Sequence, residues 1–313
     1  MRILLWHVHG SWTTAFVHGR HEYLLPVVPD RGPDGRGRAR TWDWPPSAIE
    51  VTRDQARNAQ VDAVILQRPV ELERLARDWL GDRRQPTIYV EHNAPQGRIA
   101  EMRHPTADRD DLTVVHVTHF NDLFWDCGST RTRVIEHGVV DPGYRYTGET
   151  RRAAVVINEA RRRARVTGTD LLQRFATDGV PIDLFGMDAG DVGPPTRAID
   201  DVPQHRLHDE LARRRVYLHP IRWTSLGLSL IEAMHLGMPV VALATTEAPE
   251  AVPAAAGVLS TSVERLSEAA RDFLADADRA REAGVAARDA ALRRFGLLRF
   301  LSDWDDLLEE VAA

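Results

Sequence analysis

Two successive series of short, Val- and Ile-rich apolar runs constrain the fold of this chain most strongly. Most runs lack the apolar–polar alternation of half-exposed strands, so they are typical of parallel strands buried on both faces. The first series lies at residues 3–6, 61–66, 87–90, 112–117 and 134–135. The second series lies at residues 153–157, 182–185, 216–219, 239–243 and 257–259.

Helical patterns separate many of these runs, as parallel strands require. They lie at residues 70–80, 170–177, 204–213, 228–236, 263–274 and 276–294. A final amphipathic segment covers residues 297–311. The alternation predicts an α/β protein, and two consecutive series predict two Rossmann-like lobes facing a cleft. The Pro-, Gly- and Arg-rich stretch at residues 26–46 predicts a long surface loop.

Composition excludes several partners and chemistries. The net charge of −6 argues against a nucleic-acid partner. No apolar run approaches the roughly 20 residues of a membrane span, which leaves only peripheral membrane association open. The lone Cys127 excludes an internal disulfide and a CxxC motif, and we expect a cytoplasmic protein.

The chain contains no lysine, so all 40 basic residues are arginines. This excludes the phosphate-binding lysine of a P-loop, a Schiff-base lysine and the kinase lysine. An anionic ligand must therefore be held by arginines, histidines or backbone amides.

The most informative segment is Tyr217–Ala242, which reads as strand, loop, helix and strand. The loop before the helix brings free backbone amides to a helix N-terminus, which favours anions. Gly227 lets the backbone approach a ligand closely. Gly237 and Pro239 end the helix and begin the next strand.

The run GLSLIEAMHLGMPVVA within this segment resembles the nucleotide-sugar motif of retaining glycosyltransferases of family GT4, which have the GT-B fold. The resemblance implies that Glu232 binds the ribose hydroxyls, while Thr224 replaces the family glutamate that contacts the transferred sugar. It places Gly227 and Leu228 beside the diphosphate. The donor-binding residues implied in this segment are Thr224, Ser225, Leu226, Gly227, Leu228 and Glu232.

Further segments extend the resemblance from about residue 86 to residue 311. Gly168–Leu172 resembles the family's Lys-Gly-Val-Asp-Leu-Leu, and the arginines just before it fall where the family keeps its phosphate arginine. We assign that role to Arg163 or Arg165. The run TIYVEHN resembles a strand that ends in a histidine beside the donor sugar, here His92.

The resemblance also implies a domain organisation. The N-terminal acceptor-side lobe covers residues 1–143, and residues 296–313 return to it as a helix that crosses back. The nucleotide-sugar-binding lobe covers residues 144–295. In the family, the loop after the first strand approaches the donor phosphates, which adds Gly10 and Ser11 to the donor-binding residues.

The implied function is a retaining glycosyltransferase that uses a nucleotide-diphosphate sugar as donor, with no metal and no other cofactor. His92, Arg163 and Arg165 are its candidate catalytic residues. The short first lobe favours a small acceptor.

Three alternatives remain at this point. A sugar-nucleotide epimerase or hydrolase with the GT-B fold would share the ribose-binding glutamate. A non-catalytic nucleotide-sugar-binding protein would explain why Thr224 and Thr167 replace a glutamate and a lysine of the family. The pair His7 and His9 after the first strand also fits a metal-dependent amidohydrolase, although such enzymes commonly need a lysine and a single eight-stranded barrel.

Overall fold

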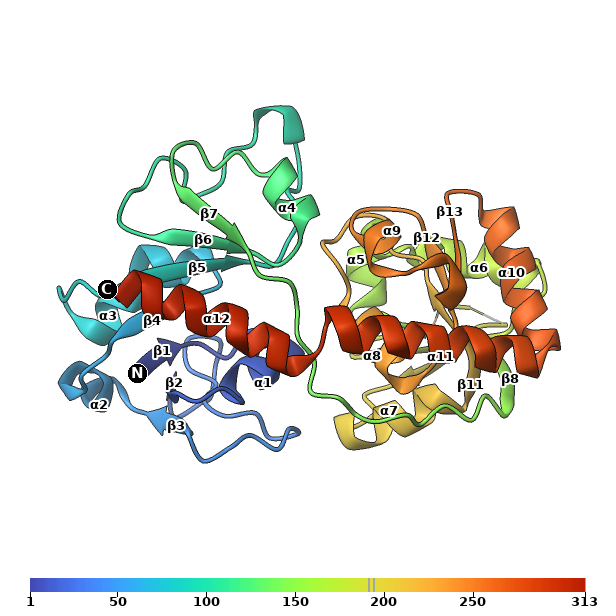
Figure 1. Ribbon diagram of the computed structural model, residues 1–313, viewed down its shortest axis with the longest axis horizontal. Helices are drawn as coiled ribbons and strands as arrows, with labels where there is room; N and C mark the ends of the chain where they lie inside the picture. Colours follow the sequence, from blue (N-terminus) through green and yellow to red (C-terminus); the bar gives the residue numbers. More distant parts are fainter. Residues whose placement is uncertain (191, 194, 313) are drawn as a thin grey trace. The chain divides into compact units, whose positions relative to one another are not determined.

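A computed structural model describes residues 1–190, 192–193 and 195–312 (Figure 1). The chain forms two compact units. The N-terminal unit comprises Met1–Val140 and the chain from Leu297 onward, and the C-terminal unit comprises Asp141–Gly296. The division thus falls after residue 140, where the sequence placed it after residue 143.

Among the described residues, the N-terminal unit has a seven-stranded parallel sheet of order β3-β2-β1-β4-β5-β6-β7. Its strands are β1 (Arg2–Leu5), β2 (Glu22–Pro26), β3 (Ala48–Val51), β4 (Ala63–Leu66), β5 (Thr87–Glu91), β6 (Thr113–His116) and β7 (Arg131–Val134). The apolar runs of the sequence predicted neither β2 nor β3, which extend the sheet beyond β1. Because the strand order reverses between β1 and β4, this unit has a switch point there, where α/β proteins bind ligands.

Helices cover this sheet, and α12 returns to it from the end of the chain (Figure 1). They are α1 (Gly10–Val17), α2 (Arg53–Asn58), α3 (Ala76–Leu80), α4 (His119–Phe124) and α12 (Leu297–Ala312), with a π-helical turn η1 (Glu71–Leu75) and a 3-10 turn η2 (Ile99–Glu101). The ring of Trp304 on α12 lies 5.7 Å from that of Trp12 and 4.9 Å from that of Phe16, both on α1. This buried aromatic cluster holds the C-terminal helix on the N-terminal unit, as the sequence predicted.

Residues 27–47, between β2 and β3, form a strap that is anchored to the rest of its unit. Trp44 Nε1 donates to Thr14 Oγ1 at 2.8 Å, and Trp6 Nε1 donates to the Asp34 carbonyl at 3.1 Å. The guanidinium of Arg38 donates to the carbonyls of Trp44, Pro45 and Ala48. The predicted surface loop is therefore pinned over α1 and the residues that follow β1.

The C-terminal unit has a six-stranded parallel sheet within the described residues, of order β10-β9-β8-β11-β12-β13. Its strands are β8 (Thr150–Val156), β9 (Ile182–Gly186), β10 (Arg197–Asp200), β11 (Arg214–His219), β12 (Val240–Leu243) and β13 (Gly257–Ser260). Its helices are α5 (Ala160–Thr167), α6 (Thr169–Thr177), α7 (Gln204–Arg213), α8 (Leu228–Leu236), α9 (Ala248–Ala251), α10 (Val263–Ala275) and α11 (Ala277–Arg294), with a 3-10 turn η3 (Ala254–Ala256). The switch point of this sheet lies between β8 and β11.

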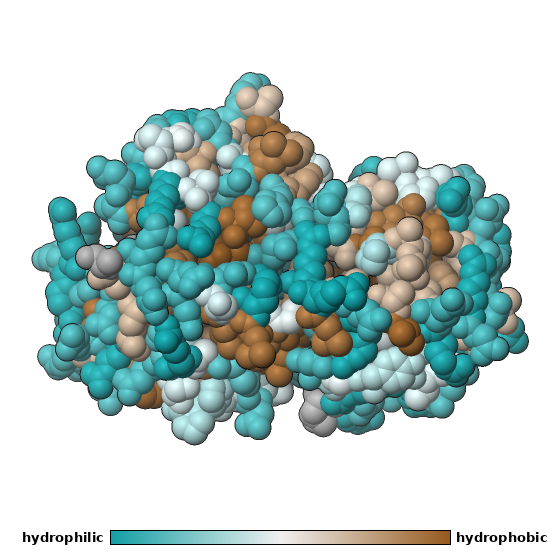
Figure 2. All heavy atoms as spheres, viewed as in Figure 1, coloured by the Kyte–Doolittle hydropathy of each residue, from teal (hydrophilic) through white to brown (hydrophobic). Residues whose placement is uncertain are grey.

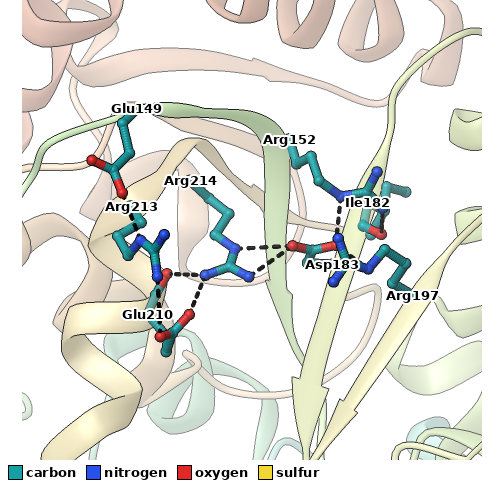
Figure 3. A network of polar contacts seen from close by, with 8 residues as sticks. All are labelled: Glu149, Arg152, Ile182, Asp183, Arg197, Glu210, Arg213 and Arg214. Atoms are coloured by element: carbon teal, nitrogen blue, oxygen red, sulfur yellow. Dashed lines mark hydrogen bonds and ion pairs between the residues drawn. The ribbon is translucent and has the colours of Figure 1, made fainter.

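A buried ion-pair network joins the amino-terminal parts of three strands in this unit (Figure 3). Asp183 near the start of β9 is 0% exposed and accepts from Arg152 Nε of β8 at 2.5 Å and from Arg214 Nε of β11 at 2.9 Å. Arg214 also pairs with Glu210 Oε2 of α7 at 2.6 Å. The network lies at the strand ends opposite the switch-point loops, so it stabilises the sheet rather than lining a ligand site.

The surface contains one apolar feature of note on α4. Figure 2 shows a hydrophobic patch over this helix, where Leu123 is 80% exposed and Phe124 is 37% exposed.

In the part of the chain that the structure describes, no helix is both long and apolar enough to cross a membrane.

Candidate functional site

The C-terminal end of α5, the helix that follows β8, contacts the loop that follows β11 in the C-terminal unit. The backbone amides of Arg222 and Trp223 donate to the Val166 carbonyl at 3.0 and 3.1 Å. Gly168 has φ +73°, and a Cβ atom there would lie 1.9 Å from the Pro220 carbonyl oxygen, so only glycine permits this contact. The arginine-bearing segment is thereby fixed against the segment that leads into α8.

The N-terminus of α8 is built for close backbone approach. Its N-cap is Gly227, which makes no side-chain capping bond, and the first amides of a helix have no acceptor within the helix. A Cβ atom on Gly227 would lie 2.8 Å from Cε1 of the buried His219. Burial lowers the pKa of His219 to about 4, so this imidazole is neutral at pH 7.

Five of the predicted donor-binding residues, residues 224–228, lie at this helix start. Thr224, Gly227 and Leu228 are half-buried, whereas Ser225 and Leu226 are buried in the loop. The two buried side chains therefore support the loop, and their backbone is the part that can meet a ligand.

Glu232, one turn into α8, is only 5% exposed. Its Oε2 lies 3.6 Å from Nε2 of His208 on α7. Tyr217 of β11 donates through its hydroxyl to Ser229 Oγ at 2.9 Å on the same helix. The carboxylate thus lies beside an imidazole of its own unit, and the ribose role that the sequence implies for it stays a prediction.

The two candidate arginines differ in their surroundings. Arg165 is exposed and lies 3.3 Å from Asp170 Oδ2, and the same carboxylate is bound by both terminal nitrogens of Arg222 at 2.5 and 2.9 Å. Arg163 is half-buried, and among the described residues its guanidinium has neither a hydrogen-bond nor an ion-pair partner. Burial, with the charge of Arg162, lowers the pKa of Arg163. An unpaired, partly desolvated cation favours an anionic ligand, so Arg163 fits a phosphate contact better than Arg165.

In the N-terminal unit, three residues gather near the carboxyl ends of β1, β4 and β5. His92 follows β5, and its ring centroid lies 4.1 Å from that of His9 and 5.3 Å from that of Trp12. Its Nε2 lies 3.0 Å from Oε1 of Gln67, which follows β4. His92 therefore lies at a strand end, as the sequence predicted. It packs against His9 in the loop that follows β1.

Gly10 and Ser11 form the first turn of α1, directly after His9. A Cβ atom on Gly10 would lie 3.3 Å from Nε1 of Trp42 in the strap, so the small residue makes room for that indole. These two residues thus lie beside His9 at the switch point of their unit, and their contact with a donor remains a prediction.

The amidohydrolase alternative finds no support in this geometry. His7 turns to the strap, where its Nδ1 lies 3.2 Å from the Gly37 carbonyl and its ring 4.8 Å from that of Trp44. His9 instead packs on His92. The two imidazoles have different neighbours, and the two open sheets are not an eight-stranded barrel.

The sequence did not indicate Gln67, His208 and His219 as neighbours of the candidate residues. Gln67 follows β4 directly, and His219 ends β11. Polar residues at the carboxyl ends of predicted parallel strands were the available signal for both. His208 could not be found in this way because it lies on a helix.

Part of the chain is similar in sequence to known glycosyltransferases. Residues 193–290 match the family model "Glycosyl transferases group 1". Alpha-maltose-1-phosphate synthase of Mycolicibacterium smegmatis (strain ATCC 700084 / mc(2)155) is 31% identical over 121 residues. That match covers 36% of this chain and 31% of the relative, so it spans under a third of the relative's length.

Solved structures share the fold over the whole chain. Sucrose-phosphate synthase from Thermosynechococcus elongatus superposes with a TM-score of 0.75 at 14% identity, covering 99% of each chain. HepE of Anabaena in complex with UDP-glucose gives a TM-score of 0.70 at 12% identity, covering 99% of this chain and 100% of the other. The chain therefore has the GT-B fold, as the sequence resemblance predicted, and its residues 193–290 are similar to the glycosyltransferase group 1 family.

Proposed function

We propose that this chain is a retaining glycosyltransferase that moves a sugar from a nucleoside diphosphate sugar to an acceptor hydroxyl without a metal. The observation that carries the proposal is Arg163, a half-buried guanidinium without an ion-pair partner among the described residues. It lies on a segment whose Val166 carbonyl binds the amides just before the α8 N-terminus. The structure of HepE with UDP-glucose supports the same class of donor here.

The chemical problem is the negative charge that develops on the departing diphosphate. We infer that Arg163 and the first amides of α8, which belong to the same unit, meet that charge. Fixed donors of this kind stabilise a transition state without reorganising during the reaction. They supply the charge compensation that a metal provides elsewhere, so the proposal needs no cofactor beyond the donor substrate.

The remaining donor contacts follow from the group 1 resemblance. Glu232 accepts from the ribose hydroxyls, and Thr224 faces the transferred sugar. Gly10, Ser11, Ser225, Leu226, Gly227 and Leu228 present backbone to the donor. His92 acts on the sugar as its anomeric carbon becomes electron-poor.

In the retaining reaction, the bond between the anomeric carbon and the diphosphate oxygen breaks. The acceptor oxygen forms its bond to the same face of that carbon, and its proton passes to the departing phosphate oxygen. The products are the glycoside and the nucleoside diphosphate. No separate base is required, and we propose a small acceptor because the N-terminal unit is short. The cytoplasmic location expected from the sequence stays a prediction.

A matched pair of variants tests the proposal. Arg163→Ala should weaken nucleoside diphosphate binding about tenfold or more, because hydrogen bonds to charged groups contribute about 1.5–3 kcal/mol and 1.4 kcal/mol is one decade. Arg165→Ala should change it much less, because Asp170 already binds that guanidinium. Calorimetric titration with UDP, GDP, TDP and ADP identifies the base and measures both effects. Equal losses of nucleoside diphosphate affinity in the two variants would remove the main support for the proposal.

Turnover with the best donor then tests the reaction class. NMR spectra of the product should show the anomeric configuration of the donor, and the rate should be the same in EDTA. Activity lost on chelation would contradict metal independence. Consumption of donor without an acceptor would indicate the hydrolase or epimerase alternative, and binding without turnover would indicate a binding protein.

A further inference from the structure

The side chain of Gln67 joins two strand ends of the N-terminal unit. Gln67 directly follows β4 and is 5% exposed. Its Nε2 donates to the Trp6 carbonyl after β1 at 2.8 Å, and its Oε1 lies 3.0 Å from Nε2 of His92 after β5. Since β4 lies between β1 and β5, the amide spans the switch point of the sheet.

The orientation of this amide is determined by its partners. A backbone carbonyl can only accept, so the NH₂ group of Gln67 faces Trp6 and the amide oxygen faces His92. The backbone is fixed as well, because the Gln67 amide donates to Oε2 of Glu71 at 2.6 Å, a fully buried carboxylate. Arg68 Nε in turn binds Glu71 Oε1 at 2.6 Å.

An amide oxygen only accepts hydrogen bonds, so the contacting Nε2 of His92 must carry a hydrogen. The other ring nitrogen, Nδ1, has no hydrogen-bond partner among the described residues. In the neutral imidazole, Nδ1 is then an acceptor.

We propose that Gln67 is a positioning residue that holds His92 as the Nε2–H tautomer, so that Nδ1 accepts a hydrogen bond from a hydroxyl of the transferred sugar. The sugar-binding part rests on the proposed function. A neutral acceptor suits this position, because a sugar that gains positive charge at its anomeric carbon would be repelled by an imidazolium ion.

The surroundings of His92 keep it neutral. The titratable groups around it are His9 on the loop after β1 and His137 after β7, whose ring centroids lie 4.1 and 6.4 Å away. Burial and these two imidazoles lower the pKa of His92 well below its ordinary value. Arg299 of α12 acts on His137 in the same direction.

The tautomer can be measured on the wild-type protein directly. Long-range ¹H–¹⁵N spectra of histidine-labelled protein, assigned with His92→Asn, should show His92 neutral with the hydrogen on Nε2 between about pH 5 and 8. An Nδ1–H tautomer, a mixture of the two, or an imidazolium ion in this range would overturn the proposal. This readout does not depend on turnover, so it is separate from any failure of the proposed function.

The variant Gln67→Glu tests the role of the amide. Its carboxylate should raise the pKa of His92 and charge the ring, lowering kcat at least tenfold, with the activity recovering as pH rises. Nucleoside diphosphate affinity should stay unchanged. Gln60→Glu is the matched control, because it makes the same change at an exposed residue before β4.

Gln67→Met removes the acceptor without adding charge and should give a mixture of tautomers in the same spectra. A Gln67→Glu enzyme with the wild-type pH profile, or a Gln67→Met protein that keeps pure Nε2–H, would show that Gln67 does not set the tautomer.

Discussion

Nε2 of His208 on α7 lies 3.6 Å from Oε2 of Glu232 on α8, and both side chains are largely buried. The carboxylate that the motif assigns to ribose binding therefore also contacts a neighbouring helix. A variant at this position changes the packing between α7 and α8 as well as the proposed nucleotide contact, and its test must separate these two effects.

Glu232→Ala should weaken nucleoside diphosphate binding about tenfold or more, because it removes charge-assisted hydrogen bonds to the ribose. Calorimetric titration with the diphosphate and its 2′,3′-dideoxy analogue measures this. The analogue should bind wild type and variant alike. If it also loses affinity for the variant, the effect comes through the α7–α8 contact and not through the ribose hydroxyls.

Thr224→Ala should change the preference among donor sugars while leaving nucleoside diphosphate affinity nearly unchanged. A neutral hydrogen bond contributes about 0.5–1.5 kcal/mol, so the ratio of kcat/KM between two sugars should move about two- to tenfold. Thr224→Glu restores the family carboxylate and is the reciprocal variant. Equal losses of affinity for the diphosphate and the nucleotide sugar would show that Thr224 does not face the sugar.

Asp183→Ala should destabilise the protein by about 3–5 kcal/mol, because it removes a fully buried counterion from Arg152 and leaves Arg214 with Glu210 alone. Arg214 and Arg152 both lose a partner, as Figure 3 shows. Glu149→Ala is the control, since Glu149 and its partner Arg213 are both about half exposed. Denaturant unfolding should show a large loss for the first variant and little change for the second. A similar, small loss in both would mean that the buried network contributes little.

Stability should fall as the pH drops from about 6.5 toward 4, because two buried histidines stay neutral in the folded protein. Burial lowers the pKa values of His116 and His219 from the ordinary 6.5 to about 4. The unfolded chain therefore binds protons in this range that the folded chain does not, which favours unfolding. Unfolding free energies measured across this pH range should be less steep for His116→Gln. An unchanged slope would mean that His116 is not a source of the dependence.

The sequence predicted the two-unit α/β architecture because buried parallel strands leave a local signal. The central strands β1, β4, β8 and β11 are short Val-, Ile- and Leu-rich runs that need no tertiary information to be found. The edge strands β3 and β10 were missed because they are four-residue runs that contain polar and exposed positions. The neighbouring strand β2 was also missed, although four of its five residues are buried. Without β2 and β3, the reversal of strand order beside β1 could not be located.

The motif around α8 was equally local, because a glycine at the helix start, a glutamate one turn on and the following turn lie in one continuous segment.

Arg163 and Arg165 are two residues apart and chemically identical, so the sequence had no means to choose between them. The structure distinguishes them because the backbone leaves helical geometry at Ala164 (φ +37°), and Asp170 pairs with Arg165. The sequence by itself thus determined the fold class and the helix start of the donor motif. Tertiary structure alone decided the burial of Glu232 beside His208, the lack of an ion-pair partner for Arg163 among the described residues, and the Gln67 contact to His92. Each of these depends on which strand ends and helices become neighbours.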